Sequence, residues 1–338
     1  MKHFVTRYKI IATWVALVSL GIQGSAWAAD VHIERIFIFG DSLSDPGNVY
    51  QLTGETSQPP YAIIPSRPYD FQGFQFSNGR TWAQWFARHL ELKRSGKAAL
   101  EWPGRFGNYA FGGARARLTD DPFRSPSSRE QFERYLNDYN GNVFPDALYV
   151  IQFGGNDVRD GLEKFLAVLA ERVPPGQEPT TDDVNAALFQ ASLIIQPAVE
   201  TLIGLIAELH GLGARHFLVA TSPDLGLTPA VRFAGPEAAA IASMMAGSYN
   251  DGLETGLAAL RALPGISINT LDLFSILGAI VEDPKAFGIR NTDTPCLIFM
   301  VETGAVCRRP NKYLFWDGIH PTARVHKIVS EIAAELYD

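Results

Sequence analysis

The chain has 338 residues, of which 46% are hydrophobic and 19% charged, and its formal net charge is −7. This composition is that of an ordinary globular protein long enough to bury a large core. The acidic balance excludes the basic surface that nucleic-acid binding requires. It also weakens attraction to anionic lipid, so any peripheral contact with lipid aggregates should be apolar.

The first 28 residues have the pattern of a secretory signal peptide. A basic start from Lys2 to Lys9 precedes an apolar run over Ile10–Ile22, and Ala26-Trp27-Ala28 is a small-residue cleavage site. The run is shorter than the roughly 20 residues that span a bilayer, and we expect no second run of that length downstream. The sequence therefore predicts cleavage after Ala28, a single mature domain over residues 29–338, and a secreted or periplasmic location.

The first predicted strand covers Ile36–Gly40, whose apolar side chains fit a strand buried on both faces. Gly40-Asp41-Ser42 then ends the strand in a tight turn. In open α/β sheets, ligands bind at the carboxyl ends of the strands. Ser42 is therefore a candidate nucleophile, although the tripeptide alone is more often only a turn. Residues Tyr50–Arg80 follow as a long loop, for which a functional and a structural role are equally open.

Four further apolar runs alternate with helical patterns. The strands are predicted over Gly107–Gly113, Ala147–Phe153, His216–Ala220 and Ile266–Leu271. Helices are predicted over Trp82–Leu90, Arg129–Leu136, Val184–His210, Gly235–Leu263, Asp272–Glu282 and Thr322–Tyr337, with a shorter one after Gly161. This alternation predicts an α/β protein whose parallel sheet is covered by helices on both faces.

The last predicted loop carries a second group of reactive side chains. Asp317 precedes His320 by three residues, so its carboxylate can reach the imidazole Nδ1 locally. A serine nucleophile needs such a base, and the base needs an orienting acceptor. His326 lies on the following helix, where we expect it to face solvent. Cys296 and Cys307 can pair in an exported chain, and two independent buried thiols are the alternative.

Ester cleavage also needs donors for the oxyanion that forms in the transition state. The candidates are the backbone N–H of Ser42, the N–H of one glycine in Gly112-Gly113, and the side-chain amide of Asn156. All three follow predicted strands, so one sheet edge can bring them together. Further acids at Asp41, Asp45 and Asp157 are interpreted as turn-stabilising acceptors, and no metal or cofactor is expected.

The chain contains four short motifs that together resemble those of a known protein family. In chain order they read GDSLSDPGN, NYAFGGA, FGGND and WDGIHPT, and together they resemble the four sequence blocks of the GDSL lipase/esterase family, also called SGNH hydrolases. The resemblance implies a flavodoxin-like α/β/α sandwich with a five-stranded parallel sheet. It also implies a Ser42–His320–Asp317 triad, with Ser42, Gly113 and Asn156 as oxyanion donors and Gly112 as the competing glycine. The motif forms are most similar to the secreted bacterial branch of the family.

The predicted activity is therefore hydrolysis of carboxylic esters, with small-molecule or lipid esters as substrates. An acyltransferase or a phospholipase that uses the same acyl-enzyme is the alternative. A binding module without catalysis is a third hypothesis, disfavoured because every position that carries the chemistry is present.

Overall fold

The computed structural model describes residues 33–119 and 125–337. The predicted signal peptide and its cleavage site lie outside these residues. The two predicted halves of the candidate site, near Ser42 and near His320, both lie within them.

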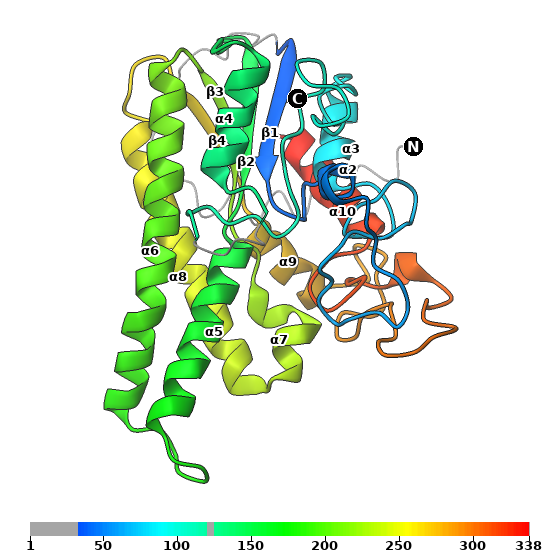
Figure 1. Ribbon diagram of the computed structural model, residues 1–338, viewed down its shortest axis with the longest axis vertical. Helices are drawn as coiled ribbons and strands as arrows, with labels where there is room; N and C mark the ends of the chain where they lie inside the picture. Colours follow the sequence, from blue (N-terminus) through cyan, green and yellow to red (C-terminus); the bar gives the residue numbers. More distant parts are fainter. Residues whose placement is uncertain (1–32, 120–124, 338) are drawn as a thin grey trace. The chain divides into compact units, whose positions relative to one another are not determined.

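A parallel sheet forms the centre of the described domain (Figure 1). Its strands are β1 (Arg35–Gly40), β2 (Ala147–Gln152), β3 (His216–Ala220) and β4 (Ser267–Leu271), and they pair in that order. The register aligns the ends of neighbouring strands, because Gly40 pairs with Gln152 and Gln152 pairs with Ala220. The loops that carry Ser42 and Asn156 therefore leave adjacent strands at the same edge of the sheet.

The predicted fifth strand, Gly107–Gly113, is not formed, and the five-stranded count is wrong. The segment runs along the outer side of β1, where the N–H of Ile38 donates to Gly107 O and the N–H of Tyr109 donates to Ile38 O. The N–H of Phe111 still donates to Gly40 O, but the N–H of Gly40 donates to the Gln131 side chain, so the ladder is incomplete and only one bridge, between Ile38 and Asn108, forms. The segment lies beside β1 and is second in chain order. If it is counted with the four strands and all five are numbered in chain order, the spatial order is the flavodoxin-like arrangement 2-1-3-4-5.

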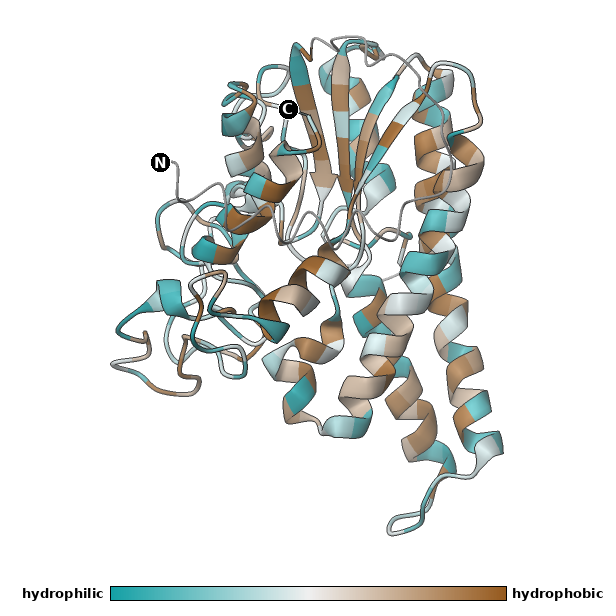
Figure 2. Ribbon diagram, turned by 180° about the vertical axis from the view of Figure 1, so that it is seen from behind, coloured by the Kyte–Doolittle hydropathy of each residue, from teal (hydrophilic) through white to brown (hydrophobic). Residues whose placement is uncertain are grey.

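Helices cover both faces of the sheet. They are α2 (Asn48–Thr53), α3 (Trp82–His89), α4 (Ser128–Asp138), α5 (Gly155–Arg172), α6 (Thr181–Gly211), α7 (Pro229–Phe233), α8 (Pro236–Leu260), α9 (Leu273–Glu282) and α10 (Ala323–Ala334). Side chains of α4, α6 and α8 join one face of the strands in a single core cluster. Helices α3 and α10 pack on each other at the other side of β1 (Figure 1). Figure 2 shows the hydrophobic colouring of the strands between these layers.

Two helix predictions differ from the structure in ways that matter for the site. Helix α5 begins at Gly155 rather than near Gly161, so Asn156 lies in its first turn. Helix α7 lies outside the predicted helices, since its five residues give too short a pattern for periodicity to reveal.

Helix α6 corrects the expectation that no second apolar run follows the N-terminal one. It has 31 residues and contains an 18-residue stretch with a mean hydropathy of 1.5, so by length and composition it is long and apolar enough to cross a bilayer. About a quarter of that apolar stretch, 28%, is buried. Its inner side packs in the main core through Ala187, Ala191, Ile195, Ala198, Leu202, Leu205, Ile206 and Leu209.

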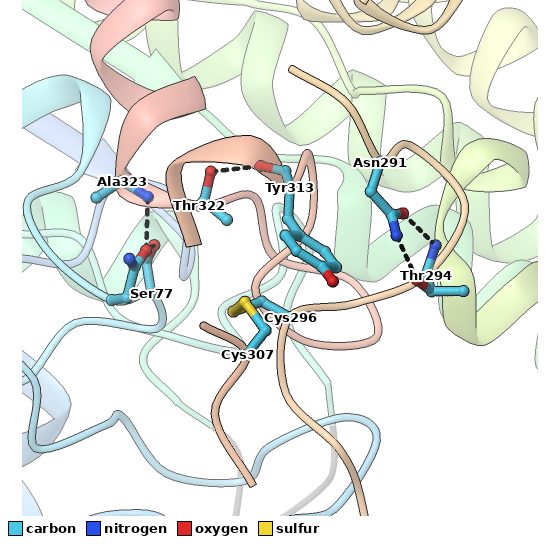
Figure 3. Close-up of a disulfide and its surroundings, with 9 residues drawn as sticks. Ser77, Asn291, Thr294, Cys296, Cys307, Tyr313, Thr322 and Ala323 are labelled. Atoms are coloured by element: carbon cyan, nitrogen blue, oxygen red, sulfur yellow. Dashed lines mark hydrogen bonds between the residues drawn. A yellow bond between two sulfur atoms is a disulfide. The ribbon is translucent and has the colours of Figure 1, made fainter. Parts of the chain in front are cut away.

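The C-terminal loop is joined to the long loop after α2 by a small aromatic cluster. Cys296 and Cys307 form a disulfide with an S–S distance of 2.10 Å, and it lies near Tyr313 and the start of α10 (Figure 3). The N–H of Cys296 donates to Phe315 O. The disulfide-closed loop is thus hydrogen-bonded to the segment directly before Asp317.

Candidate active site

Ser42 lies in the turn that follows β1. The carboxylate of Asp41 accepts the N–H of Leu43 at 3.0 Å, and the carbonyl of Asp41 accepts the N–H groups of Ser44 and Asp45. These bonds close a compact turn and hold the Ser42 hydroxyl above the end of the strand. The residue is 8% exposed, so its environment is largely desolvated.

His320 joins Ser42 to Asp317. Its Nε2 lies 2.8 Å from Ser42 Oγ, and its Nδ1 lies 2.7 Å from Asp317 Oδ2. A carboxylate is only an acceptor, so Nδ1 carries the proton and Nε2 accepts the serine hydroxyl. The structure therefore brings together three side chains that the sequence separates by up to 278 positions.

The Asp317 carboxylate is fully buried and receives four donors. Besides His320 Nδ1, Oδ2 accepts the hydroxyl of Tyr69 at 2.9 Å. Oδ1 accepts the backbone N–H groups of Ile319 at 2.9 Å and His320 at 2.8 Å. Each lone-pair direction of the carboxylate is thereby used, which holds the acid in one orientation.

Gly112 and Gly113 differ sharply in what their backbone N–H groups do. The N–H of Gly112 donates to Asp45 Oδ2 at 2.9 Å, so it is already engaged. Within residues 33–119 and 125–337, the N–H of Gly113 has no hydrogen-bond acceptor, and the same is true of the N–H of Ser42. Gly112 must lack a Cβ because one would come 2.0 Å from the ring of Phe76, which packs against His320.

Asn156 is fixed from the opposite side of the site by the first turn of α5. Its Nδ2 donates to Ala114 O at 2.9 Å, which uses one of its two N–H groups. Because Ala114 directly follows Gly113, this bond ties the amide of Asn156 to the loop that carries the free Gly113 N–H. The second N–H of Asn156 Nδ2 has no acceptor within the described part of the chain.

A buried ionic network locks the same loop onto α5. Asp157 accepts the N–H of Ala116 and pairs with Arg117 at 2.6 Å, and Asp160 pairs with Arg115 and Arg117 at 2.8 Å. Burial raises the pKa of Asp157. Burial acts in the same direction on Asp160, but hydrogen bonds from Arg115 and Arg117 prevail and lower its pKa.

Asp41 and Asp45 both accept backbone N–H groups in turns, as the sequence suggested. Asp45 receives four, from Gly47, Asn48, Val49 and Gly112. Burial raises the pKa of Asp41 and that of Asp45 to about 6, against the lowering effect of these hydrogen bonds. Among the described residues, no group of three or more His, Cys, Asp or Glu side chains could hold a metal ion.

A largely apolar cavity of about 210 Å³ opens beside Ser42 and His320. Its walls come from α5, α7, α9 and α10, and include Leu162, Val231, Leu277 and Val329. Ser42 and His320 thus border a space whose walls are largely apolar.

The expectation that His326 faces solvent is wrong. Its side chain is 2% exposed and lines the cavity, and its Nδ1 accepts the backbone N–H of Trp82 at 3.2 Å. Helix α10 presents this face to α3 rather than to solvent, because apolar Val325, Ile328 and Val329 flank His326 on the packed side.

Comparison with known proteins now decides the family. The family model for the GDSL-like lipase/acylhydrolases matches residues 36–333. This chain belongs to that family.

Individual relatives cover nearly the whole chain. A GDSL esterase/lipase from Arabidopsis thaliana is 26% identical over 98% of this chain and 93% of its own length. The anther-specific proline-rich protein APG from the same plant is 26% identical over 90% of this chain, which spans 61% of that relative. An extracellular lipase from Streptomyces rimosus, compared as a solved structure, has a TM-score of 0.42 and 16% identity, covering 88% of this chain and 99% of that one.

Membership of the GDSL family makes this protein a carboxylic ester hydrolase. The structure brings together the side chains that the sequence proposed for the site of this GDSL-family chain, which are Ser42, Asp317 and His320, and it places Asn156 against the loop of Gly113. Tyr69 was not among the predicted site residues, because it sits in a Pro- and aromatic-rich loop with no periodicity or motif to mark it.

Proposed function

We propose that the protein is an exported serine ester hydrolase in which Ser42 is the nucleophile, His320 the general base and Asp317 its partner. The observation that carries the proposal is the hydrogen-bonded row of side chains, with 2.8 Å from Ser42 Oγ to His320 Nε2 and 2.7 Å from His320 Nδ1 to Asp317 Oδ2. These are the distances at which a base can take the serine proton during attack.

Acylation follows from this arrangement. Ser42 Oγ attacks the ester carbonyl carbon while its proton passes to His320 Nε2, and the carbonyl oxygen becomes an oxyanion. Asp317 stabilises the imidazolium that forms. When the tetrahedral intermediate collapses, His320 returns the proton to the leaving alcohol, and an ester bond joins the acyl group to Ser42.

The oxyanion is met by three donors: the N–H of Ser42, the N–H of Gly113 and the second N–H of Asn156 Nδ2. Gly113 is favoured over Gly112 because the N–H of Gly112 is already bonded to Asp45. Removing a single donor of this kind typically slows turnover by about 10²–10³-fold. Water then attacks the acyl-enzyme with His320 as base, which releases the acid.

Export and substrate class belong to the same proposal. The basic start, the apolar run and the Ala26-Trp27-Ala28 site support a signal peptide that is cleaved after Ala28. The Cys296–Cys307 disulfide is consistent with an oxidising compartment. The apolar cavity beside Ser42 supports substrates with an alkyl chain, either small esters or lipids presented at an aggregate surface. Mass spectrometry of the exported protein tests the cleavage, which requires Ala29 as the first residue.

The decisive experiment compares Ser42→Ala with wild type on p-nitrophenyl butyrate. We expect kcat to fall by about 10³–10⁶-fold, because triad members act as a unit, and an organophosphonate to label wild type at Ser42. Ser275→Ala, on the exposed side of α9, is the matched control and should keep full turnover. Retention of turnover by Ser42→Ala would refute the proposal. Product analysis with an added alcohol separates hydrolysis from acyl transfer.

A further inference from the structure

His326 is one of the few polar side chains that line the largely apolar cavity. Successive turns of α9 and α10 line the cavity with Leu273, Leu277, Ile280 and Val325. From Leu273 to Ile280 the wall runs about 10 Å, at 1.5 Å per helical residue. Ser42 and His320 line this cavity. His326 also lines it and follows His320 by six residues in the sequence.

The hydrogen bond from Trp82 determines which ring nitrogen of His326 carries the proton. Trp82 is the first residue of α3, so its N–H has no acceptor within that helix. It donates to His326 Nδ1 at 3.2 Å, which makes Nδ1 an acceptor. Burial, together with nearby His320, lowers the pKa of His326 to about 3. The ring is therefore neutral near pH 7, and its proton is on Nε2.

The Nε2–H group of His326 has no hydrogen-bond acceptor among residues 33–119 and 125–337. Buried donors in proteins are nearly always paired, with protein groups, water or a ligand. The residue is 2% exposed and lines the cavity, and its Nε2 is not among the fully enclosed side-chain atoms that lack a partner, so this donor reaches the cavity and its acceptor comes from whatever occupies the cavity. The cavity walls are largely apolar, so a carboxylate there would lose its hydration without a full replacement, and a neutral oxygen suits the site better.

We propose that the cavity binds a substrate chain that is apolar over most of its length and carries one neutral oxygen, a hydroxyl or a keto group, which accepts the N–H of His326. This inference rests on the proposed function, because it takes Ser42 as the point where the ester is cleaved. An unsubstituted chain displaces water from the donor without replacing its hydrogen bond, so it binds less well than the oxygenated chain. We expect about a tenfold preference in kcat/KM for the oxygenated chain.

The chain could belong to the acyl group or to the alcohol of the ester, and two substrate series distinguish these sources. The first compares p-nitrophenyl decanoate with its hydroxydecanoate isomers, in which the hydroxyl moves along the acyl chain. The second compares decyl acetate with acetate monoesters of decanediols. We expect one series to contain a hydroxyl position that raises kcat/KM at least about tenfold over the unsubstituted ester.

His326 variants then test whether this residue causes the preference. His326→Phe keeps a ring but no donor, and should abolish the preference. His326→Gln keeps an oxygen for the N–H of Trp82 and an N–H donor, and should retain most of it. His89→Phe makes the same change at the exposed end of α3 and should leave the preference intact.

Several results would overturn the inference. One is a higher kcat/KM of the wild type for the unsubstituted ester than for every hydroxylated isomer in both series. This measurement does not depend on whether any variant folds. Another is a His326→Phe enzyme that keeps the full preference. Failure of the proposed function is distinguishable, because Ser42→Ala would then retain turnover on the same esters.

Discussion

Protonation of Asp41 should make the folded protein more stable as the pH falls. The side chain is 3% exposed and accepts one backbone N–H, from Leu43. Burial raises the pKa of its carboxyl from 3.8 to about 6. The folded protein therefore binds this proton more readily than the unfolded chain does. The perturbation that exposes the effect is Asp41→Asn, which keeps an oxygen for the N–H of Leu43 but cannot ionise.

The sign and size follow from linkage. Above about pH 6 the Asp41 carboxyl is ionised in both states, and the folded state bears the full cost of burying the charge. As the pH falls through 6 toward 3.8, the folded state takes up the proton first, and the free energy of unfolding rises. A difference of about two pKa units corresponds to about 3 kcal/mol. The free energy of unfolding of Asp41→Asn minus that of wild type should therefore rise by about 3 kcal/mol as the pH is raised from about 4 to about 8.

Urea unfolding followed by tryptophan fluorescence measures this difference at each pH. Comparing the two proteins cancels titrating groups that do not interact with Asp41, such as Asp45, whose pKa is also raised to about 6. Asp251→Asn, on the exposed side of α8, controls for the loss of one negative charge at the surface. If the unfolding free energies of Asp41→Asn and wild type stay parallel over this range, burial does not raise the pKa of Asp41 and the reasoning fails.

Two further predictions concern the loops around Asp317. Tyr69→Phe removes the hydroxyl that donates to Asp317 Oδ2 at 2.9 Å. A hydrogen bond to a charged group is worth about 1.5–3 kcal/mol, so kcat/KM should fall by roughly 10- to 100-fold with little change in KM. Tyr61→Phe, in the same aromatic cluster, should not change it, and equal losses in both variants would contradict the assignment. Replacing Cys296 and Cys307 with Ala should cost about 3 kcal/mol of unfolding free energy, since the bridge closes a loop between residues 11 apart. Thermal denaturation of the double variant checks this, and an unchanged midpoint would disprove it.

The parts of the fold that were predictable are those that depend on neighbouring residues. Strands β1, β2 and β3 are largely apolar runs, because a strand in the middle of a buried parallel sheet has no solvent face, whereas the edge strand β4 mixes apolar and polar residues. Asp317 and His320 are three residues apart, so their hydrogen bond needs only one loop conformation. The edge segment around Asn108 has a similar apolar pattern, yet its pairing with β1 depends on the Gln131 side chain, 91 residues from Gly40.

By itself, the sequence determined the order of strands and helices, the turn that presents Ser42, and the pairing of Asp317 with His320. These features follow from local backbone preference and from short stretches of apolar side chains. Only the tertiary structure decided that Tyr69 donates to Asp317 across 248 positions, that Gly113 rather than Gly112 has a free N–H, and that His326 is buried. Such contacts depend on how segments distant in the sequence pack against one another, and the residues next to each position in the chain do not determine that packing.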